Sequence, residues 1–134
     1  VVNLDGSSWS NESGSEHIMY CWHSVAGYSK FGSYTGIASG NVTVTTGFRP
    51  DFVMVKCTSH GTTNWEIHDS LRVYGTNGAY RLRANDSSAD AGFNDTPIKY
   101  TSTGFYLDSS VTANSYVDYD ANGRTYIYMA FKIN

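Results

Sequence analysis

The chain has 134 residues, which is enough for one domain with its own core, and only 16% of them are charged. The net charge is −3 and the 9 lysines and arginines do not cluster, which excludes a surface that tracks the phosphates of nucleic acid. No stretch approaches the roughly 18 consecutive apolar residues of a membrane span, so we expect none. A polar surface with few charges favours a virion or extracellular location over a cytosolic enzyme.

Strand-forming residues dominate the chain, with 11 Tyr, 6 Phe and 3 Trp beside abundant Val, Ile and Thr. No apolar i, i+3, i+4 pattern lasts three turns, so we expect no helix longer than a single turn. The run 52–57 is almost continuously apolar, as in a central strand that is covered on both faces. In chain order, the expected strands cover residues 17–22, 28–34, 41–46, 52–57, 65–68, 80–83, 98–101, 104–107 and 125–133. Short strands between Gly-rich turns predict an all-β fold, an antiparallel β-sandwich of the jelly-roll or lectin-like kind with about ten short strands.

The closing segment alternates strictly between two sets of side chains. Ile127, Met129 and Phe131 share one face of this expected strand, and Tyr126 and Tyr128 share the other. If the tyrosine face is outward, these two rings lie in line.

Two more tyrosines, Tyr116 and Tyr119, precede this strand on a loop. Flat aromatic rings beside Asn and Asp suit sugar rings, and they equally suit a subunit interface, where Tyr and Trp anchors are enriched. We therefore predict that Tyr116, Tyr119, Tyr126 and Tyr128 form a glycan or subunit contact. In a fibre module we favour the subunit contact.

An internal similarity concerns the start of the chain. When residues 16–22 are placed over residues 125–131, Ile18 falls on Ile127 and Trp22 falls on Phe131. Two interpretations fit: two similar strands of one sandwich, or the tail of a preceding repeat unit followed by a complete one. The second divides the chain into an N-terminal segment, residues 1–23, and a β-sandwich domain, residues 24–134. The predicted inter-subunit assembly strand then consists of His17, Ile18, Met19, Tyr20, Cys21 and Trp22.

The start of the chain shows neither a signal peptide nor an initiating Met, which indicates a processed chain or part of a longer one.

Five motifs occur in a recognisable order: GYSKFGSYTG (27–36), TGFRPDFVMVK (46–56), NWEIHDSLR (64–72), STGFYL (102–107) and TYIYMAF (125–131). Together they resemble a tandem-repeat structural module of marine and freshwater, cyanophage-like phages, found in tail-fibre and other virion appendage proteins. The resemblance covers roughly residues 20–131, and it departs from the pattern at 37–40 and 76–78, where the turns are shorter. It implies a structural role in a virion or filament, and it brings no catalytic residue with it.

Acid–base catalysis has few candidate residues in this chain. The glutamates are Glu12, Glu16 and Glu66, and only Glu66 has a histidine and a second acid nearby, His68 and Asp69. Such a cluster could move protons, but a polar strand surface explains it as well, and we expect no enzyme activity. The 4 histidines include no H-x-x-x-H doublet, which argues against zinc.

The metal best suited to this chain is calcium, because residues 118–123 match the opening of a D-x-D-x-N-G loop. The ligands would be Asp118, Asp120 and Asn122. The position that should supply a bidentate carboxylate is occupied by Met129, so the motif is incomplete, and ordinary Asx turn chemistry accounts for it equally well. We expect no cofactor, with calcium at these residues as the open alternative.

Two further features leave alternatives open. Cys21 and Cys57 each lie in an apolar run, as an inter-strand disulfide or as two buried thiols. Four Asn-x-Ser/Thr triplets are glycan acceptors in a secreted eukaryotic protein and chance triplets otherwise: Asn11, Asn41, Asn85 and Asn94.

The sequence therefore predicts a non-catalytic structural subunit that self-associates into a fibre, filament or virion appendage, through addition of the N-terminal strand to a neighbour. The alternative is a lectin-like adhesin module of a phage tail fibre that binds cell-surface glycans.

Overall fold

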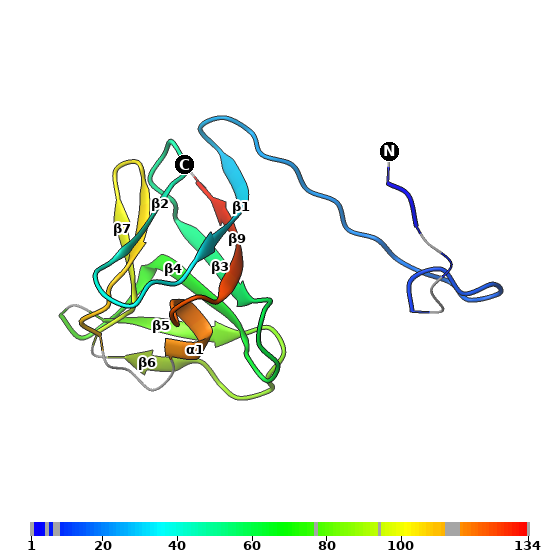
Figure 1. Cartoon of the computed structure of the whole chain (residues 1–134). Coiled ribbons are helices and arrows are strands. Elements are labelled where there is room, and N and C mark those ends of the chain that lie inside the picture. Colours follow the sequence, from blue (N-terminus) through cyan, green and yellow to red (C-terminus); the bar gives the residue numbers. More distant parts are fainter. Residues whose placement is uncertain are drawn as a thin grey trace.

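A computed structural model of the chain describes residues 2–4, 6, 9–76, 78–93, 95–111 and 116–133 (Figure 1). Within them lie nine strands and one helical turn. The elements are β1 (Ser29–Thr35), β2 (Val42–Thr45), β3 (Phe52–Cys57), β4 (Trp65–Tyr74), β5 (Gly78–Arg83), β6 (Ala91–Phe93), β7 (Ile98–Thr101), β8 (Gly104–Leu107), α1 (Tyr116–Tyr119) and β9 (Thr125–Phe131).

The strands form two antiparallel sheets. The larger has the order β1-β9-β3-β4-β5-β6, and the smaller has the order β2-β8-β7. Their inner faces share one core, in which Val53, Val55 and Tyr128 of the larger sheet pack with Phe105 and Leu107 of the smaller. The all-β, antiparallel prediction is therefore confirmed.

Several strand predictions match the structure closely, and others differ from it. The expected bounds of β3, β7 and β8 are those observed, whereas β4 is longer than predicted and β6 was not predicted. The strand expected at 17–22 is wrong, because these residues have no sheet partner among the described residues. The count is nine strands within the described ranges, where about ten were expected.

Tyrosines fill much of the core. Tyr126 is fully buried and stacks on Tyr34, with ring centroids 5.0 Å apart and an interplanar angle of 7°. The Tyr34 hydroxyl donates to the carbonyl oxygen of Tyr119 at 2.6 Å, and the Tyr126 hydroxyl accepts from the Ala121 N–H at 2.8 Å. Tyr34 and Tyr126 can line this interior because each of their hydroxyls finds a hydrogen-bond partner at its edge.

Strands β2 and β8 of the smaller sheet approach closely at Gly104. A Cβ atom at this position would clash with the carbonyl oxygen of Val44 on the neighbouring strand β2. Glycine is therefore required here by space, since its φ angle is ordinary.

Within the described ranges, no helix is long and apolar enough to cross a bilayer.

Candidate functional site

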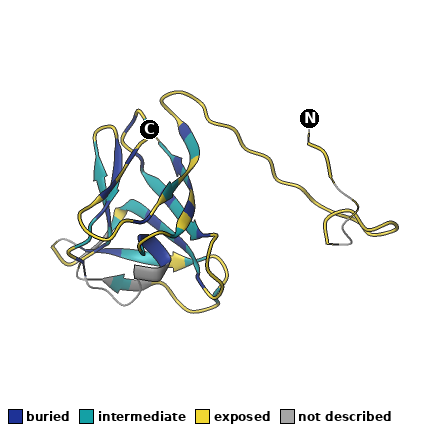
Figure 2. Cartoon of the chain, viewed as in Figure 1, coloured by how far each residue is buried: buried dark blue, intermediate teal, exposed yellow. Residues whose placement is uncertain are grey.

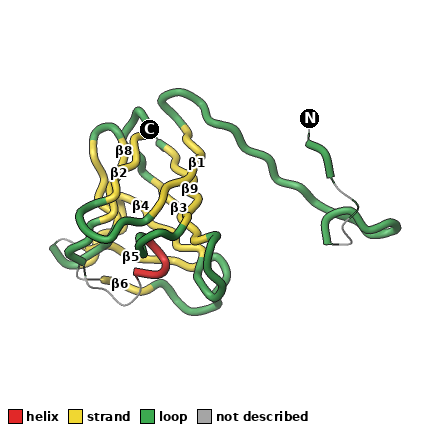
Figure 3. The backbone as a smooth tube through the Cα atoms, viewed as in Figure 1, coloured by secondary structure: helices red, strands yellow, loops and turns green. Residues whose placement is uncertain are grey.

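The most unusual part of the molecule is the chain before β1, which we call the arm (the described residues from 9 to 24). It contains no strand or helix and extends away from the two sheets (Figures 1 and 3). Its large apolar side chains are exposed along its length (Figure 2), with Ile18 82%, Tyr20 72% and Trp22 58% exposed. Exposing this many apolar side chains to water is unfavourable in free energy, so the arm is suited to contact another surface.

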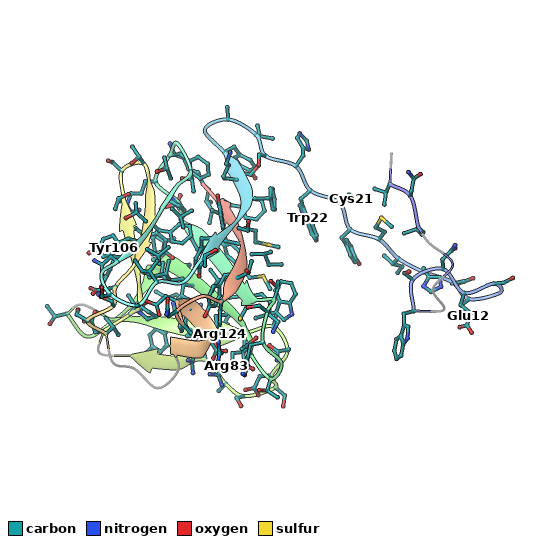
Figure 4. All side chains as sticks on the ribbon, in the orientation of Figure 1. Glu12, Cys21, Trp22, Arg83, Tyr106 and Arg124 are labelled. Atoms are coloured by element: carbon teal, nitrogen blue, oxygen red, sulfur yellow. The ribbon has the colours of Figure 1, made fainter. Side chains whose placement is uncertain are left out.

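The three most exposed large apolar side chains of the predicted assembly strand lie two residues apart. In an extended backbone, residues at i and i+2 project to the same side. The rings of Tyr20 and Trp22 accordingly stack on each other, with centroids 6.0 Å apart and 21° between their planes. Figure 4 shows Trp22 and Cys21 on the arm, clear of the sheets. The arm thus presents one apolar edge made by Ile18, Tyr20 and Trp22.

A tight turn joins the arm to β1. The N–H of Val25 donates to the carbonyl oxygen of Ser29 at 3.0 Å, and the N–H of Ser29 donates back to that of Val25 at 2.9 Å. This antiparallel bridge starts the arm alongside the outer edge of β1. The arm then leaves β1, so the bridge does not grow into a hairpin.

The larger sheet has a second apolar surface, which we call the outer face (the side chains of β1, β9, β3, β4 and β5 that point away from the smaller sheet). The strand registers place one apolar residue from each of these five strands in a row across it: Phe31, Met129, Met54, Ile67 and Leu82. All five are half-buried or exposed. A sheet that faces water normally carries polar side chains there, so this face resembles one that becomes covered.

A groove lies on the outer face next to β1. It has a volume of about 250 Å³ and an almost wholly apolar lining. Its lining residues are Phe31, Gly32, Met54, Trp65, Ile127, Tyr128 and Met129. The prediction that strand 52–57 is covered on both faces holds for its inner face, and its outer face opens into this groove.

The predicted contact made of four tyrosines is wrong for the three whose side chains are described. Tyr119, Tyr126 and Tyr128 are buried, so they belong to the core and offer no ring to a sugar or a subunit. Tyr116 lies in α1, but its side chain is outside the described set. The alternation along β9 is as predicted, but it is the face with Ile127 and Met129 that points outward.

Glu66 and His68 form the centre of a buried polar network. Arg83 Nε donates to Glu66 Oε1 at 2.8 Å, and Arg81 Nε lies 3.1 Å from Glu66 Oε2. The Tyr119 hydroxyl donates to Glu66 Oε2 at 3.1 Å. This hydroxyl therefore accepts the hydrogen bond that joins it to His68 Nε2, at 2.9 Å, which fixes the neutral tautomer with its proton on Nε2.

Burial sets the protonation of this network. It lowers the pKa of His68 to about 3, with the Arg81 charge acting in the same direction, so the imidazole is neutral at physiological pH. Burial also raises the pKa of Glu66, and this effect outweighs the two arginines that act against it. Both side chains are fully enclosed.

Asp69, the third member of the acid–base cluster considered from the sequence, is on the outer face and binds Arg72. The structure therefore does not bring the three groups together. The network instead joins β4, β5 and α1 through hydrogen bonds in the interior.

The three proposed calcium ligands are dispersed. Asp118 is buried, with Oδ1 accepting from the N–H of Asn64 at 3.0 Å and Oδ2 lying 3.8 Å from Arg83 Nη2. Asp120, which is also buried, and Asn122 border an open depression beside Ser39. Burial raises the pKa of Asp120. Among the residues that the structure describes, no group of three or more His, Cys, Asp or Glu side chains is placed to hold a metal ion.

The two cysteines are free thiols, so the disulfide interpretation is wrong. Cys21 is exposed on the arm and Cys57 is buried in the core.

The glycan-acceptor triplets differ in availability. Asn11, Asn41 and Asn85 are all exposed, but Asn41 accepts hydrogen bonds from Ser109, and Asn85 donates its amide to Asn64. Asn94 lies outside the described residues.

Sequence reasoning missed the two arginines that hold Glu66. A signal was present, because Arg81 and Arg83 are two residues apart on a predicted strand, as are Glu66 and His68 on another. Strand pairing at the right register was needed to set Arg83 opposite Glu66.

The geometry defines an all-β protein of two antiparallel sheets, with an exposed N-terminal arm. Compared with known families, residues 1–134 match the domain of unknown function DUF7483, and the chain belongs to that family. Comparison with curated proteins and with solved structures gave no match.

Proposed function

We propose that this chain is a non-catalytic structural subunit that associates with copies of itself through its arm. One observation carries the proposal: the arm exposes Ile18, Tyr20 and Trp22 on one edge while the core is complete without them. Full burial of each such side chain stabilises a complex by about 1.5–3 kcal/mol. The arm gains this energy only by contact with another surface.

The mode of association we favour is strand addition. An extended segment pairs its backbone with the edge of a neighbour's sheet, and its side chains fill pockets beside that edge. Residues 17–22 have the extended backbone this mode requires, and they contain no Asp, Glu, Lys or Arg. Subunits joined in this head-to-tail manner form open chains when the contact does not close into a ring.

The place of such chains, we propose, is a virion appendage or an extracellular fibre. The low share of charged residues supports this location, as does the resemblance of the five motifs to phage tail-fibre modules. A jelly-roll or lectin-like arrangement of the two sheets is part of the same proposal.

The test compares the full-length chain with a triple variant, Ile18→Ser, Tyr20→Ser and Trp22→Ser, by analytical ultracentrifugation over a range of concentrations. We expect the wild-type chain to associate and the variant to remain monomeric with an unchanged melting temperature. A matched control changes three other exposed apolar residues near the N-terminus: Val2→Ser, Leu4→Ser and Trp9→Ser. Association that survives in the first variant would contradict the proposal.

A second candidate function is glycan binding at the depression bordered by Ser39, Asp120 and Asn122. Polar side chains of these kinds bind sugar hydroxyls, and a calcium ion at Asp120 and Asn122 would belong to this function. It is the weaker candidate, because Tyr119, Tyr126 and Tyr128, which were expected to stack on a sugar ring, are buried in the core. A glycan array probed with and without calcium tests it, and an array with no hits in either condition would contradict it.

A further inference from the structure

The arm is prevented from pairing with the β1 of its own chain. Beyond the bridge between Val25 and Ser29, the next bonds of a hairpin would join His23 to Phe31. The two groups that would bond to each other, the carbonyl oxygen of His23 and the N–H of Phe31, are already hydrogen-bonded to side-chain hydroxyls. Ser29 Oγ donates to the carbonyl oxygen of His23 at 3.1 Å, and the N–H of Phe31 donates to Ser24 Oγ at 3.1 Å. These two hydrogen bonds end the ladder and turn the arm away.

The outer edge of β1 nevertheless remains open to another strand. β1 pairs with β9 on one side and has no other strand beside it in the described chain. The carbonyl of Tyr28 and the N–H of Gly36 bond toward β9 and its flanking residues, so the even-numbered residues between them point the same way. The backbone N–H and C=O groups of Ser33 and Thr35 therefore point outward, and both residues are exposed.

The apolar edge of the arm matches the outer face in its pattern. Residues 16–22 align with 125–131, and in this alignment Ile18 corresponds to Ile127, Tyr20 to Met129 and Trp22 to Phe131. In β9 these three positions all lie on the outer face. A strand added to β1 in the register that places Ile18 on the outer face would direct Tyr20 and Trp22 to that face too.

We propose that residues 17–22 of one copy add as a strand to the open edge of β1 in a second copy. Its Ile18, Tyr20 and Trp22 side chains then cover the groove on the outer face. This inference rests on the proposed function and identifies the surface that receives the arm. The groove begins at β1 itself, since Phe31 and Gly32 line it, so side chains from an added strand stand at its border. Residues 17–22 of the arm and the receiving strand segment, residues 31–35, all lack Asp, Glu, Lys and Arg, so we expect association that changes little with salt.

Two substitutions in the full-length chain test the receiving surface. Ser33→Pro removes an N–H that points away from β9, so it blocks an added strand while the β1–β9 pairing is kept. Ile127→Glu places a charge in the groove at a residue that is already 39% exposed. We expect each to weaken association at least tenfold, with a melting transition still present. Ser33→Ala and the exposed Leu71→Glu are the matched controls and should associate like the wild-type chain.

A mixing experiment separates this inference from the proposed function. One partner carries the arm variant (Ile18→Ser, Tyr20→Ser, Trp22→Ser), and the other carries Ser33→Pro with Ile127→Glu. Each partner alone should be monomeric. Mixed in equal amounts they should form a dimer and nothing larger, because one partner supplies only an arm and the other only a receiving edge.

Each other outcome has a definite meaning. If the Ser33→Pro, Ile127→Glu chain associates like the wild type while the arm variant does not, the arm has another receptor, and this inference is overturned while the proposed function stands. If the arm variant still associates, the proposed function fails. A wild-type chain that is monomeric at every concentration, with Cys21 protected from alkylation, would show an arm docked on its own sheets and overturn both.

Discussion

Acidification should destabilise the fold through His68. The pKa of this buried imidazole is lowered from an ordinary value of 6.5 to about 3, so below the ordinary value the unfolded chain binds a proton that the folded chain does not. The contribution of His68 to the free energy of unfolding is therefore fully present above its ordinary pKa, and it is lost as the pH falls toward its pKa in the folded chain. Between about pH 7.5 and about pH 5 the linkage relation gives a loss of about 2 kcal/mol from this residue alone.

The measurement is urea unfolding followed by tyrosine and tryptophan fluorescence at several pH values, for the wild type and for His68→Gln. The Gln side chain keeps an N–H donor for the Tyr119 hydroxyl and removes the titrating ring. We expect the wild type to lose about 2 kcal/mol more than the variant over this pH range. Glu66, whose pKa is raised by burial, acts in the opposite direction on acidification, but it is present in both proteins and cancels in the difference.

A matched control is His60→Gln, which removes an exposed histidine and should keep the wild-type loss. The reasoning is refuted if the wild type and His68→Gln differ by less than about 0.5 kcal/mol across the range, because the buried ring would then take up its proton inside the fold.

Three further predictions concern the buried network, the close approach at Gly104 and the two cysteines. Glu66→Ala should cost about 3–5 kcal/mol in urea unfolding, because it leaves Arg81 and Arg83 without their buried carboxylate, whereas Glu16→Ala on the arm should be neutral. Gly104→Ala should lower the free energy of unfolding by about 1–3 kcal/mol through the clash with Val44, and Gly61→Ala, where a Cβ meets nothing, should not; equal effects would contradict the close approach of β2 and β8. Iodoacetamide should modify one cysteine of the native monomer, Cys21, and both after denaturation, whereas a chain that shows no reactive thiol even when denatured without reductant would point to a disulfide.

The sequence was informative where local pattern decides structure. Alternation and apolar runs located β3, β7 and β8 at their observed bounds, because a strand that forms one wall of a core must repeat every two residues. The same rule failed at 17–22. A strand needs a partner strand for its backbone hydrogen bonds. The nearest candidate is β1, and the hydroxyls of Ser24 and Ser29 occupy the groups that would pair with it.

The inward face of β9 could not be chosen from hydrophobicity, since both of its faces are apolar. Tyr126 is inside because its hydroxyl reaches the N–H of Ala121, a residue from the preceding turn. Likewise the sequence placed Glu66 and His68 on one face, but their partners come from β5 and α1. Contacts of this kind depend on register and on turns that no short motif records.

The position of β9 also has a consequence for synthesis of the chain. This strand lies between β1 and β3, so these two strands are joined only through a segment that is synthesised nearly a hundred residues after β1. Pairing between segments so far apart in the sequence is slow. The larger sheet cannot be completed until residue 131 has left the ribosome. Until then, the nascent chain exposes the unpaired edges of both β1 and β3. Long-range pairing with β9 or binding of a chaperone must cover these edges before they pair with other nascent chains on the same messenger RNA.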